Sequence, residues 1–185
     1  MVDKVATLLK SAGHRVTALD LAASGVNRKQ VHQVKSISEY FEPLMEFMMS
    51  LPLEERVILV AHSYGGLGIS FAMERFPDKI SAAVFATATI PGPDMTYTTI
   101  REELYRRIDF MDSQFTFDYG PNNPPSSRLF GPNCLSSSLY QLSQTEDLML
   151  AMMLIRPFPL FSNASIQIES VLTKEKYGSV PRIYI

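Results

Sequence analysis

Residues 57–66 hold the sequence feature that most constrains the fold of this chain. They read Val-Ile-Leu-Val-Ala-His-Ser-Tyr-Gly-Gly, so an apolar run leads into a serine and then into two glycines. A strand at residues 56–61 would be apolar on both faces, which is typical of a central strand in a parallel sheet. Residues 65–76 then have helical periodicity, which ends before Pro77. The pattern predicts a buried strand, a sharp turn at Ser63 and a helix.

Ser63 stands where such a turn would expose a nucleophile. A serine hydroxyl is a weak nucleophile at its free pKa, so it needs a base within hydrogen-bond reach and a fixed, exposed position. The turn brings the residues two before and two after the serine close together, and Ala61 and Gly65 are small enough for that approach. The backbone N–H of Tyr64 would open the helix and donate to an oxyanion. We therefore predict Ser63 as nucleophile and Tyr64 as oxyanion donor.

None of the three histidines fits the role of the base. His62 is next to the serine, but adjacent side chains diverge at such a turn, and the base of this arrangement comes from a later loop in the order Ser, acid, His. We expect a packed or hydrogen-bonded structural role for His62. His14 and His32 precede the serine and are interpreted as surface turn positions. The acids that follow the serine are interpreted as helix caps and solvated positions: Asp94, Asp109, Asp112, Asp118 and Asp147.

The flanking segments predict an α/β fold with a mostly parallel sheet. Residues 5–11 are interpreted as the end of a helix closed by Gly13, and residues 15–21 as a strand followed by a turn at 22–25. Residues 36–50 have helical spacing, with Ser36 or Ser38 as the cap and Pro43 as a kink. Residues 80–88 form another buried strand. The order strand, helix, strand, helix, strand is that of a doubly wound sheet.

The chain changes character at Ile90, where prolines begin to divide it into short pieces. Helical stretches are predicted near residues 98–111 and 137–155, and a strand at 180–185. We therefore expect the first half of a core domain at 1–89, an inserted, mainly helical cap at 90–175, and a return to the core sheet at 176–185. The cap is rich in aromatic residues that either line an apolar ligand pocket or pack its own core.

Charge and cysteine content exclude several classes of function. Seventeen basic and nineteen acidic residues, without a long run of either sign, argue against nucleic acid and anionic membranes as partners. The single cysteine, Cys134, and the missing signal-peptide pattern favour a soluble protein of a reducing compartment, which we expect to be the cytoplasm. Metal-site spacings of Cys and His are absent from the sequence, so no metal or other cofactor is expected.

The sequence resembles the plant methylesterases, a family of α/β-hydrolases that includes salicylate- and jasmonate-methyl-ester hydrolases and is related to hydroxynitrile lyases. The similarity lies in residues 12–25, 57–66, 72–80, 130–132, 139–142, 146–148, 156–157 and 178–185. It implies an α/β-hydrolase fold with helices on both faces of the sheet, Ser63 as nucleophile and Tyr64 as oxyanion donor. Four cap positions look like pocket residues: Tyr105, Phe110, Phe115 and Leu160. Phe110 stands where many relatives have tryptophan, and Arg128 replaces an apolar pocket residue.

The function that the resemblance implies is hydrolysis of small methyl esters of the salicylate, jasmonate or indole-acetate type. Family members also have a strand and a His-Gly loop before the first matched segment, and a catalytic Asp and His after the strand that ends at Ile185. We therefore expect a chain that is incomplete at both ends and has doubtful activity by itself. Two alternatives stay open: a hydroxynitrile lyase, and a non-catalytic product that binds a small hydrophobic acid. A homodimer is one option for its assembly.

Overall fold

The computed structural model describes residues 2–185, which form two compact units. The first unit contains the residues up to Val34 together with Phe110–Leu160. The second contains Lys35–Asp109 and Phe161–Ile185. These units divide the chain differently from the predicted domain boundaries after residues 89 and 175, and those boundaries stay a prediction.

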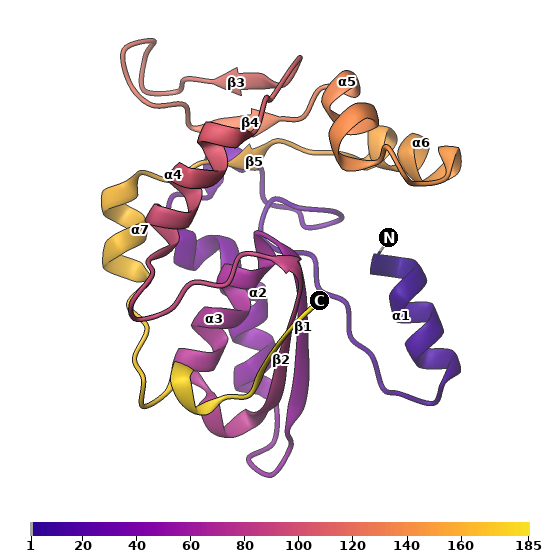
Figure 1. Ribbon diagram of the computed structural model, residues 1–185, viewed down its shortest axis with the longest axis vertical. Coiled ribbons are helices and arrows are strands. Elements are labelled where there is room, and N and C mark those ends of the chain that lie inside the picture. Colours follow the sequence, from indigo (N-terminus) through magenta and orange to yellow (C-terminus); the bar gives the residue numbers. More distant parts are fainter. Residues whose placement is uncertain (1) are drawn as a thin grey trace. The chain divides into compact units, whose positions relative to one another are not determined.

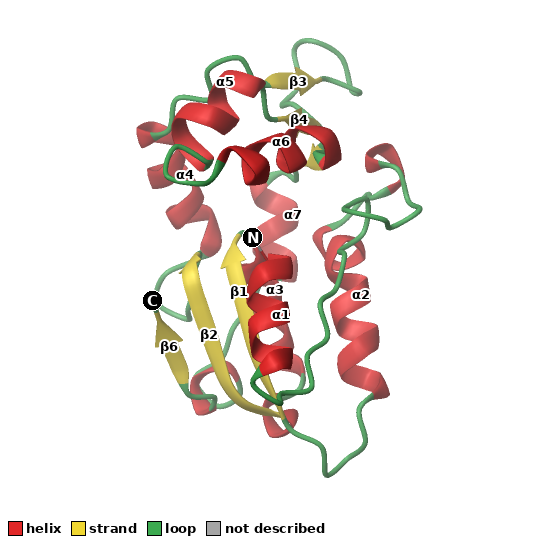
Figure 2. Cartoon of the chain, turned by 90° about the vertical axis from the view of Figure 1, so that its right-hand side faces the viewer, coloured by secondary structure: helices red, strands yellow, loops and turns green. Residues whose placement is uncertain are grey.

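The second unit is built on a parallel three-stranded sheet. Its strands are β1 (Val57–Ser63), β2 (Ile80–Ala88) and β6 (Arg182–Tyr184), in the order β1-β2-β6. They lie side by side in Figure 2. Helix α3 (Gly65–Arg75) and the short helix η2 (Pro77–Lys79) connect β1 to β2, so the predicted strand–turn–helix–strand order is confirmed.

Helix α2 (Ile37–Ser50) and helix α3 pack on one face of this sheet and form the core of the second unit. Phe41 and Met48 of α2, Leu67 and Met73 of α3 and Phe85 of β2 are at most 1% exposed. This unit also contains α4 (Tyr97–Arg107), α7 (Asn163–Glu169) and the short helix η4 (Tyr177–Ser179).

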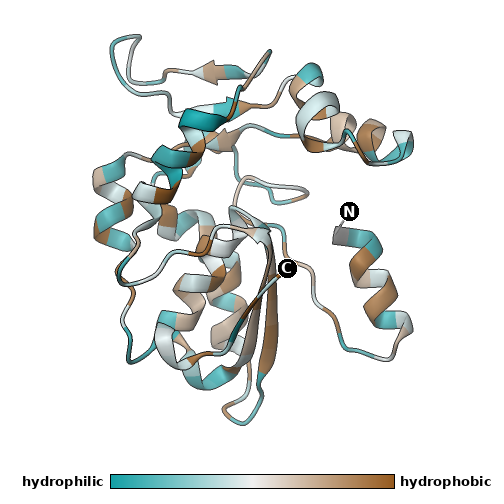
Figure 3. Cartoon of the chain, viewed as in Figure 1, coloured by the Kyte–Doolittle hydropathy of each residue, from teal (hydrophilic) through white to brown (hydrophobic). Residues whose placement is uncertain are grey.

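The other face of the sheet shows where the prediction for β1 is wrong. Leu59 and Ala61 are buried, as expected, but Ile58 is 62% exposed and Val60 is 55% exposed. Side chains alternate between the two faces of a strand, so β1 is buried on one face only. Hydrophobic residues run along the strands nonetheless (Figure 3). The apolar run therefore predicted the presence of the strand correctly. Its prediction that both faces of the strand are buried is wrong.

The start of α2 resolves the choice between two predicted caps. The hydroxyl of Ser36 accepts a hydrogen bond from the backbone N–H of Glu39 at 3.1 Å. The Glu39 carboxylate in turn accepts from the backbone N–H of Lys35 at 2.8 Å. This reciprocal arrangement satisfies N–H groups that the first helical turn leaves without an intrahelical acceptor. Ser38 instead donates to the carboxylate of Glu169, and the helix continues through Pro43 to Ser50.

The first unit combines short helices with an antiparallel sheet. Its helices are α1 (Val2–Ser11), η1 (Val31–Gln33), α5 (Pro132–Cys134), η3 (Leu135–Leu139) and α6 (Thr145–Leu154). Its strands are β3 (Gln114–Thr116), β4 (Ser127–Leu129) and β5 (Phe158–Pro159), in the order β3-β4-β5 (Figure 1). The region predicted as a mainly helical cap therefore also contains a sheet. The single helical stretch predicted near residues 137–155 is divided by a turn after η3.

Residues 15–21 are not a strand, so this prediction is wrong. The helix before them ends as predicted, with Gly13 at φ +88°, and residues 22–26 form the expected turn. Residues 14–20 are exposed apart from the half-buried Val16, and the described residues provide no neighbouring strand for them. A β-rich composition forms a strand only where another backbone supplies hydrogen bonds.

The loop after this turn is held by Arg156. Its guanidinium donates hydrogen bonds to the carbonyl oxygens of Gly25 at 3.0 Å, Asn27 at 2.6 Å and Lys29 at 2.7 Å. Within the described residues, 2–185, no helix is long and apolar enough to cross a membrane.

Candidate active site

The turn between β1 and α3 has the backbone geometry expected of a nucleophile elbow. Strand β1 ends at Ser63, and Ser63 has a φ of +52°. A residue with a Cβ rarely adopts this left-handed conformation, which costs on the order of 1–3 kcal/mol. The carbonyl oxygen of Ser63 accepts a hydrogen bond at 2.9 Å from the backbone N–H of Thr89, just after β2. The sheet therefore holds a strained turn that leaves Ser63 exposed.

Small residues surround this turn because the backbone segments come close together. A Cβ added at Gly65 would lie 3.3 Å from the Cβ of Ala61, which is tight but not prohibitive. A Cβ added at Gly66 would lie 2.0 Å from the carbonyl oxygen of Thr89. The prediction that Ala61 and Gly65 are small because the backbone segments at the turn come close together is thus confirmed. The tighter constraint is at Gly66, which the sequence pattern did not single out.

The side chain of Tyr64 anchors the start of α3 in an aromatic cluster. Its ring stacks on Phe41 at a centroid distance of 5.6 Å and meets Tyr97 edge-on at 5.5 Å. Tyr40 lies at 5.8 Å. Aromatic pairs at these separations contribute about 0.5–1.5 kcal/mol each beyond the area that they bury. The cluster therefore fixes the residue whose backbone N–H follows Ser63.

Burial raises the pKa of the Tyr64 phenol well above its usual value, and the neighbouring Tyr97 and Tyr40 add to the effect. Burial also raises the pKa of Tyr177, whose hydroxyl donates to the carbonyl oxygen of Pro91 at 2.5 Å. There is therefore a range of pH in which both phenols are neutral in the folded chain but ionised in the unfolded chain. The folded state binds more protons than the unfolded state in that range, so stability falls as the pH rises.

We expect the free energy of unfolding to fall above about pH 10, by up to about 1.4 kcal/mol per pH unit for each tyrosine. The contribution is fully present below the unfolded pKa and is lost as the pH rises from that value through the higher pKa of the folded chain. Urea titrations from pH 8 to 11 measure it, and Tyr64→Phe should reduce the slope. An equal slope in Tyr64→Phe and the unmodified chain would show that Tyr64 does not contribute.

Two of the residues predicted to line the pocket touch each other in the first unit. The rings of Phe110 and Phe115 meet edge-on at 5.9 Å. Leu160 follows β5, and its backbone N–H donates to the carbonyl oxygen of Ser126 at 2.8 Å. Tyr105 belongs to α4 of the second unit and is 39% exposed. The pocket role of these four residues stays a prediction.

Comparisons with known proteins agree with the strand–turn–helix geometry. The model of the alpha/beta hydrolase fold matches residues 2–170. Methyl jasmonate esterase 1 from Vitis vinifera is 55% identical over 98% of this chain and 70% of its own length. Salicylic acid-binding protein 2 from Nicotiana tabacum is 43% identical over 98% of this chain and 71% of its own. The chain belongs to the plant methylesterase family of α/β-hydrolases.

Solved structures of related proteins share the fold. Tomato methylketone synthase I, solved with 2-tridecanone, has a TM-score of 0.95 and 47% identity over 98% of this chain and 71% of its own. Polyneuridine aldehyde esterase has a TM-score of 0.88 and 39% identity over 98% of this chain and 72% of its own. The predicted α/β-hydrolase fold and the family resemblance are therefore confirmed.

The histidines of this methylesterase-family chain lie at exposed positions. His62 is on the same exposed face of β1 as Ile58 and Val60. Of the two structural roles expected for it, packed or hydrogen-bonded, the packed role is therefore wrong. Within residues 2–185, no histidine or carboxylate side chain is hydrogen-bonded to the Ser63 hydroxyl. A base for Ser63 is thus not among the described contacts.

Several of the acids make structural contacts, as expected of caps and solvated positions. Asp112 accepts hydrogen bonds from the backbone N–H groups of Asn133 at 2.9 Å and Cys134 at 3.0 Å, and these bonds lower the pKa of its carboxyl group. Asp147 forms an ion pair with Lys4 at 2.7 Å. Of the described residues, no group of three or more His, Cys, Asp and Glu side chains could hold a metal ion.

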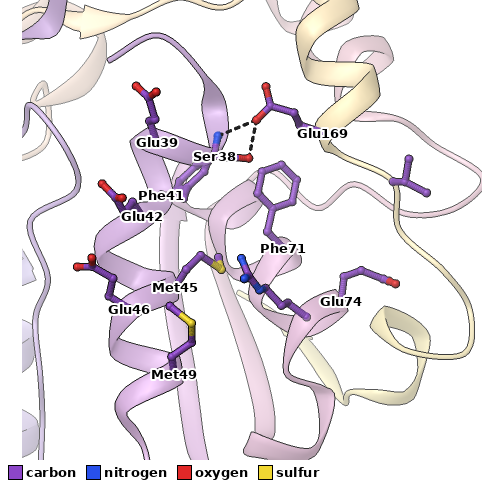
Figure 4. A pocket seen from close by; sticks show the side chains of 12 residues that line it. Ser38, Glu39, Phe41, Glu42, Met45, Glu46, Met49, Phe71, Glu74 and Glu169 are labelled. Atoms are coloured by element: carbon purple, nitrogen blue, oxygen red, sulfur yellow. Dashed lines mark hydrogen bonds between the residues drawn. The ribbon is translucent and has the colours of Figure 1, made fainter. Parts of the chain in front are cut away.

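A hollow of about 460 Å³ lies beside α2 and α3, away from the residues predicted for catalysis. Met45, Met49 and Phe71 contribute apolar side chains to it. In Figure 4, Glu42 and Glu46 extend from α2 on the outer side, and Glu169 meets Ser38 at one end. Neither Ser63 nor any predicted pocket residue lines this hollow.

Arg128, which departs from the family pattern in the sequence, is a buried residue of the first unit. It lies in β4 and is only 8% exposed. Its guanidinium carbon is 4.3 Å from the centre of the Phe110 ring and 4.5 Å from that of Phe130. A buried cation therefore contacts one of the predicted pocket residues.

Proposed function

We propose that this chain carries the acyl-transfer site of a carboxylic ester hydrolase for small methyl esters, with Ser63 as the nucleophile. The observation that carries this proposal is the strained φ of +52° at an exposed serine between a parallel strand and a helix. The relatives named above, a methyl jasmonate esterase and a salicylic acid-binding protein, support a small ester as the substrate class.

In the proposed reaction, Ser63 Oγ attacks the carbonyl carbon of the ester and its proton passes to a base. The carbonyl oxygen becomes an oxyanion, which the backbone N–H of Tyr64 stabilises at the start of α3. Collapse of this intermediate breaks the bond to the methoxy group, which leaves as methanol after protonation. Water then attacks the acyl-serine, releases the carboxylic acid and restores the Ser63 hydroxyl.

The rate of this reaction depends on the base. His14, His32 and His62 precede the serine and lie at exposed positions, so none of them suits that role. Removing members of a catalytic triad leaves only a residual rate, about 10³–10⁴-fold over water. We therefore expect the chain by itself to turn over esters slowly, and a covalent probe is the more sensitive test.

The test is labelling of the purified chain with a fluorophosphonate, followed by mass spectrometry of the peptides. We expect one adduct, on Ser63, and its loss in Ser63→Ala. Ser81→Ala is the matched control, because Ser81 is an exposed serine of β2 in the same sheet. Methanol release from methyl salicylate and methyl jasmonate measures turnover in parallel. No adduct on the unmodified chain, or equal labelling of Ser63→Ala, would contradict the assignment.

A cytoplasmic location and a homodimer stay predictions. The single cysteine supports a reducing compartment. Analytical ultracentrifugation would measure the assembly.

A further inference from the structure

The hollow beside α2 and α3 lies entirely within the second unit and has an apolar floor. Met45 and Met49 of α2 and Phe71 of α3 supply this floor, and Val171 adds to it. In Figure 4 the two methionines and the phenylalanine point into the space between the helices. Met49 is 52% exposed, so part of the floor is open to solvent. Methionine side chains are flexible and polarisable, so such a floor adapts to apolar groups of different shapes.

Negative charge borders this floor along α2. Glu39, Glu42 and Glu46 follow one another at intervals of three and four residues, which places them on one side of the helix (Figure 4). Helix α2 contains no lysine or arginine to oppose them. Like charges four residues apart on a helix repel each other, so this pattern does not stabilise α2. The approach of a cationic group to this border is therefore favourable.

Two further glutamates, Glu74 of α3 and Glu169 of α7, line the same hollow. Glu169 accepts hydrogen bonds from the backbone N–H and the hydroxyl of Ser38. Glu74 accepts one from the backbone N–H of Thr173 at 2.8 Å. These donors are neutral, so they do not cancel the charges of the two carboxylates. The basic lining residue, Arg75, has its guanidinium over the adjacent phenylalanine ring. Five glutamates against one arginine leave a strong excess of negative charge.

The length of the hollow suits an elongated occupant. It follows α2 from Ser38 to Met49. A helix rises about 1.5 Å per residue, so these two positions are about 16 Å apart along the axis, the length of about three turns of a second helix. An amphipathic helix binds by laying its apolar face into an apolar groove. Lysine and arginine side chains on such a helix can cover apolar surface with their stems while their charged ends reach nearby carboxylates.

We propose that this hollow is a docking site for a basic amphipathic helix of a partner protein. Apolar side chains of that helix lie on Met45, Met49 and Phe71, and its lysines or arginines meet the glutamates along α2. Ser63 does not line the hollow, so the site is separate from the acyl-transfer chemistry proposed for that residue. Docking adds a protein-binding function that does not depend on ester hydrolysis.

The test measures binding of a fluorescent synthetic peptide to the purified chain by fluorescence anisotropy. The peptide has about 15 residues, enough to form a helix, with leucine on one face and lysine on the other. Its controls are a scrambled peptide of the same composition without an apolar face, and a peptide with glutamate in place of lysine. We expect a Kd of about 10 μM or below for the first peptide and binding at least about tenfold weaker for both controls. Affinity should fall as the salt concentration rises, because ions screen the charges.

Reversal of the charges on α2 locates the site. Glu42→Lys/Glu46→Lys should weaken binding of the leucine–lysine peptide about tenfold or more, because it places like charges opposite each other. The matched control is Glu54→Lys/Glu175→Lys, which changes the net charge equally at two exposed residues that do not line the hollow. This control should change the affinity by about twofold or less, through the weaker field of distant charges.

Met49→Gln tests the apolar floor with a polar side chain of similar length. It should weaken peptide binding about threefold or more, because less apolar surface is buried. Met95→Gln is the control and should leave the affinity unchanged, since Met95 is 56% exposed and does not line the hollow. The melting temperature of each variant should match that of the unmodified chain. Fluorophosphonate labelling of Ser63 should be the same with and without saturating peptide.

Several results would overturn the inference. No binding of the leucine–lysine peptide, or equal weakening by Glu54→Lys/Glu175→Lys, would show that the hollow is not the site. Equal binding of the scrambled peptide, or full displacement by free spermidine at the same concentration of amines, would show attraction of cations without recognition of a helix. Self-association of the unmodified chain that is lost in Glu42→Lys/Glu46→Lys would show that a second copy is the occupant. Slower labelling of Ser63 in the presence of the peptide would contradict the separation of the two sites.

Discussion

Gly66→Ala is expected to destabilise the fold by about 3 kcal/mol or more, through steric overlap at the end of the elbow. The new Cβ would lie 2.0 Å from the carbonyl oxygen of Thr89 and 3.1 Å from the Cβ of Ala88. The first of these atoms is backbone, so it cannot rotate away. Helix α3 would have to shift from the end of β2, and the hydrogen bond between Ser63 and Thr89 would be strained.

The expected loss of stability in Gly66→Ala is opposite to the change that helix propensity predicts. Alanine is favoured over glycine in a helix interior by about 1 kcal/mol, so an increase in stability would be expected without the overlap. Urea unfolding followed by circular dichroism measures the difference. Gly178→Ala is the control, since the nearest atoms to its Cβ would be 3.7 Å away. A Gly66→Ala chain as stable as Gly178→Ala would show that the approach of Thr89 is not as close as described.

Phe41→Ala is expected to lower the free energy of unfolding by about 3–5 kcal/mol, because it leaves a cavity in the core of the second unit. Phe41 is 1% exposed and contacts the rings of Tyr40, Tyr64 and Phe71. Its loss removes the stacking partner of Tyr64. We therefore also expect fluorophosphonate labelling of Ser63 to slow, beyond the effect of the unfolded fraction.

A second substitution sharpens this test. A Cβ at Gly68 would lie 2.5 Å from the Phe41 ring, so Gly68→Ala should be destabilising by itself. In the double variant the new methyl group enters the cavity left by Phe41→Ala, and the combined loss should be smaller than the sum. Phe117→Ala is the control, because Phe117 is 45% exposed and should cost less than about 1 kcal/mol. Strict additivity would contradict the contact between Gly68 and Phe41.

Much of the second unit could be predicted because its signals are local. The cap at Ser36, the apolar runs of β1 and β2, and the glycines after Ser63 each act over a few residues of the chain. These signals indicated a parallel strand–helix–strand unit and a sharp turn at Ser63. The choice between Ser36 and Ser38 needed the structure, since either residue could cap and only Ser36 accepts from Glu39.

The errors occur where a residue depends on distant partners. Residues 15–21 have a β-rich composition but no neighbouring strand among the described residues. Ile58 and Val60 are apolar but exposed, because their burial depends on what covers the second face of the sheet. The helical cap prediction missed β3, β4 and β5, whose strands have only two or three residues each and little periodicity.

The sequence by itself determined the family, the order of strand, turn and helix, and the position of Ser63 at the turn. These features follow from the size and spacing of residues within about ten positions of each other. Steric limits on the backbone and hydrophobic periodicity act over that range. Only the tertiary structure showed the strained φ of Ser63, the approach of Thr89 to Gly66 and the aromatic surroundings of Arg128. The approach of Thr89 and the rings around Arg128 join segments that are distant in the chain, and Thr89 also donates a hydrogen bond to the carbonyl oxygen of Ser63. Such contacts depend on packing in three dimensions rather than on local pattern.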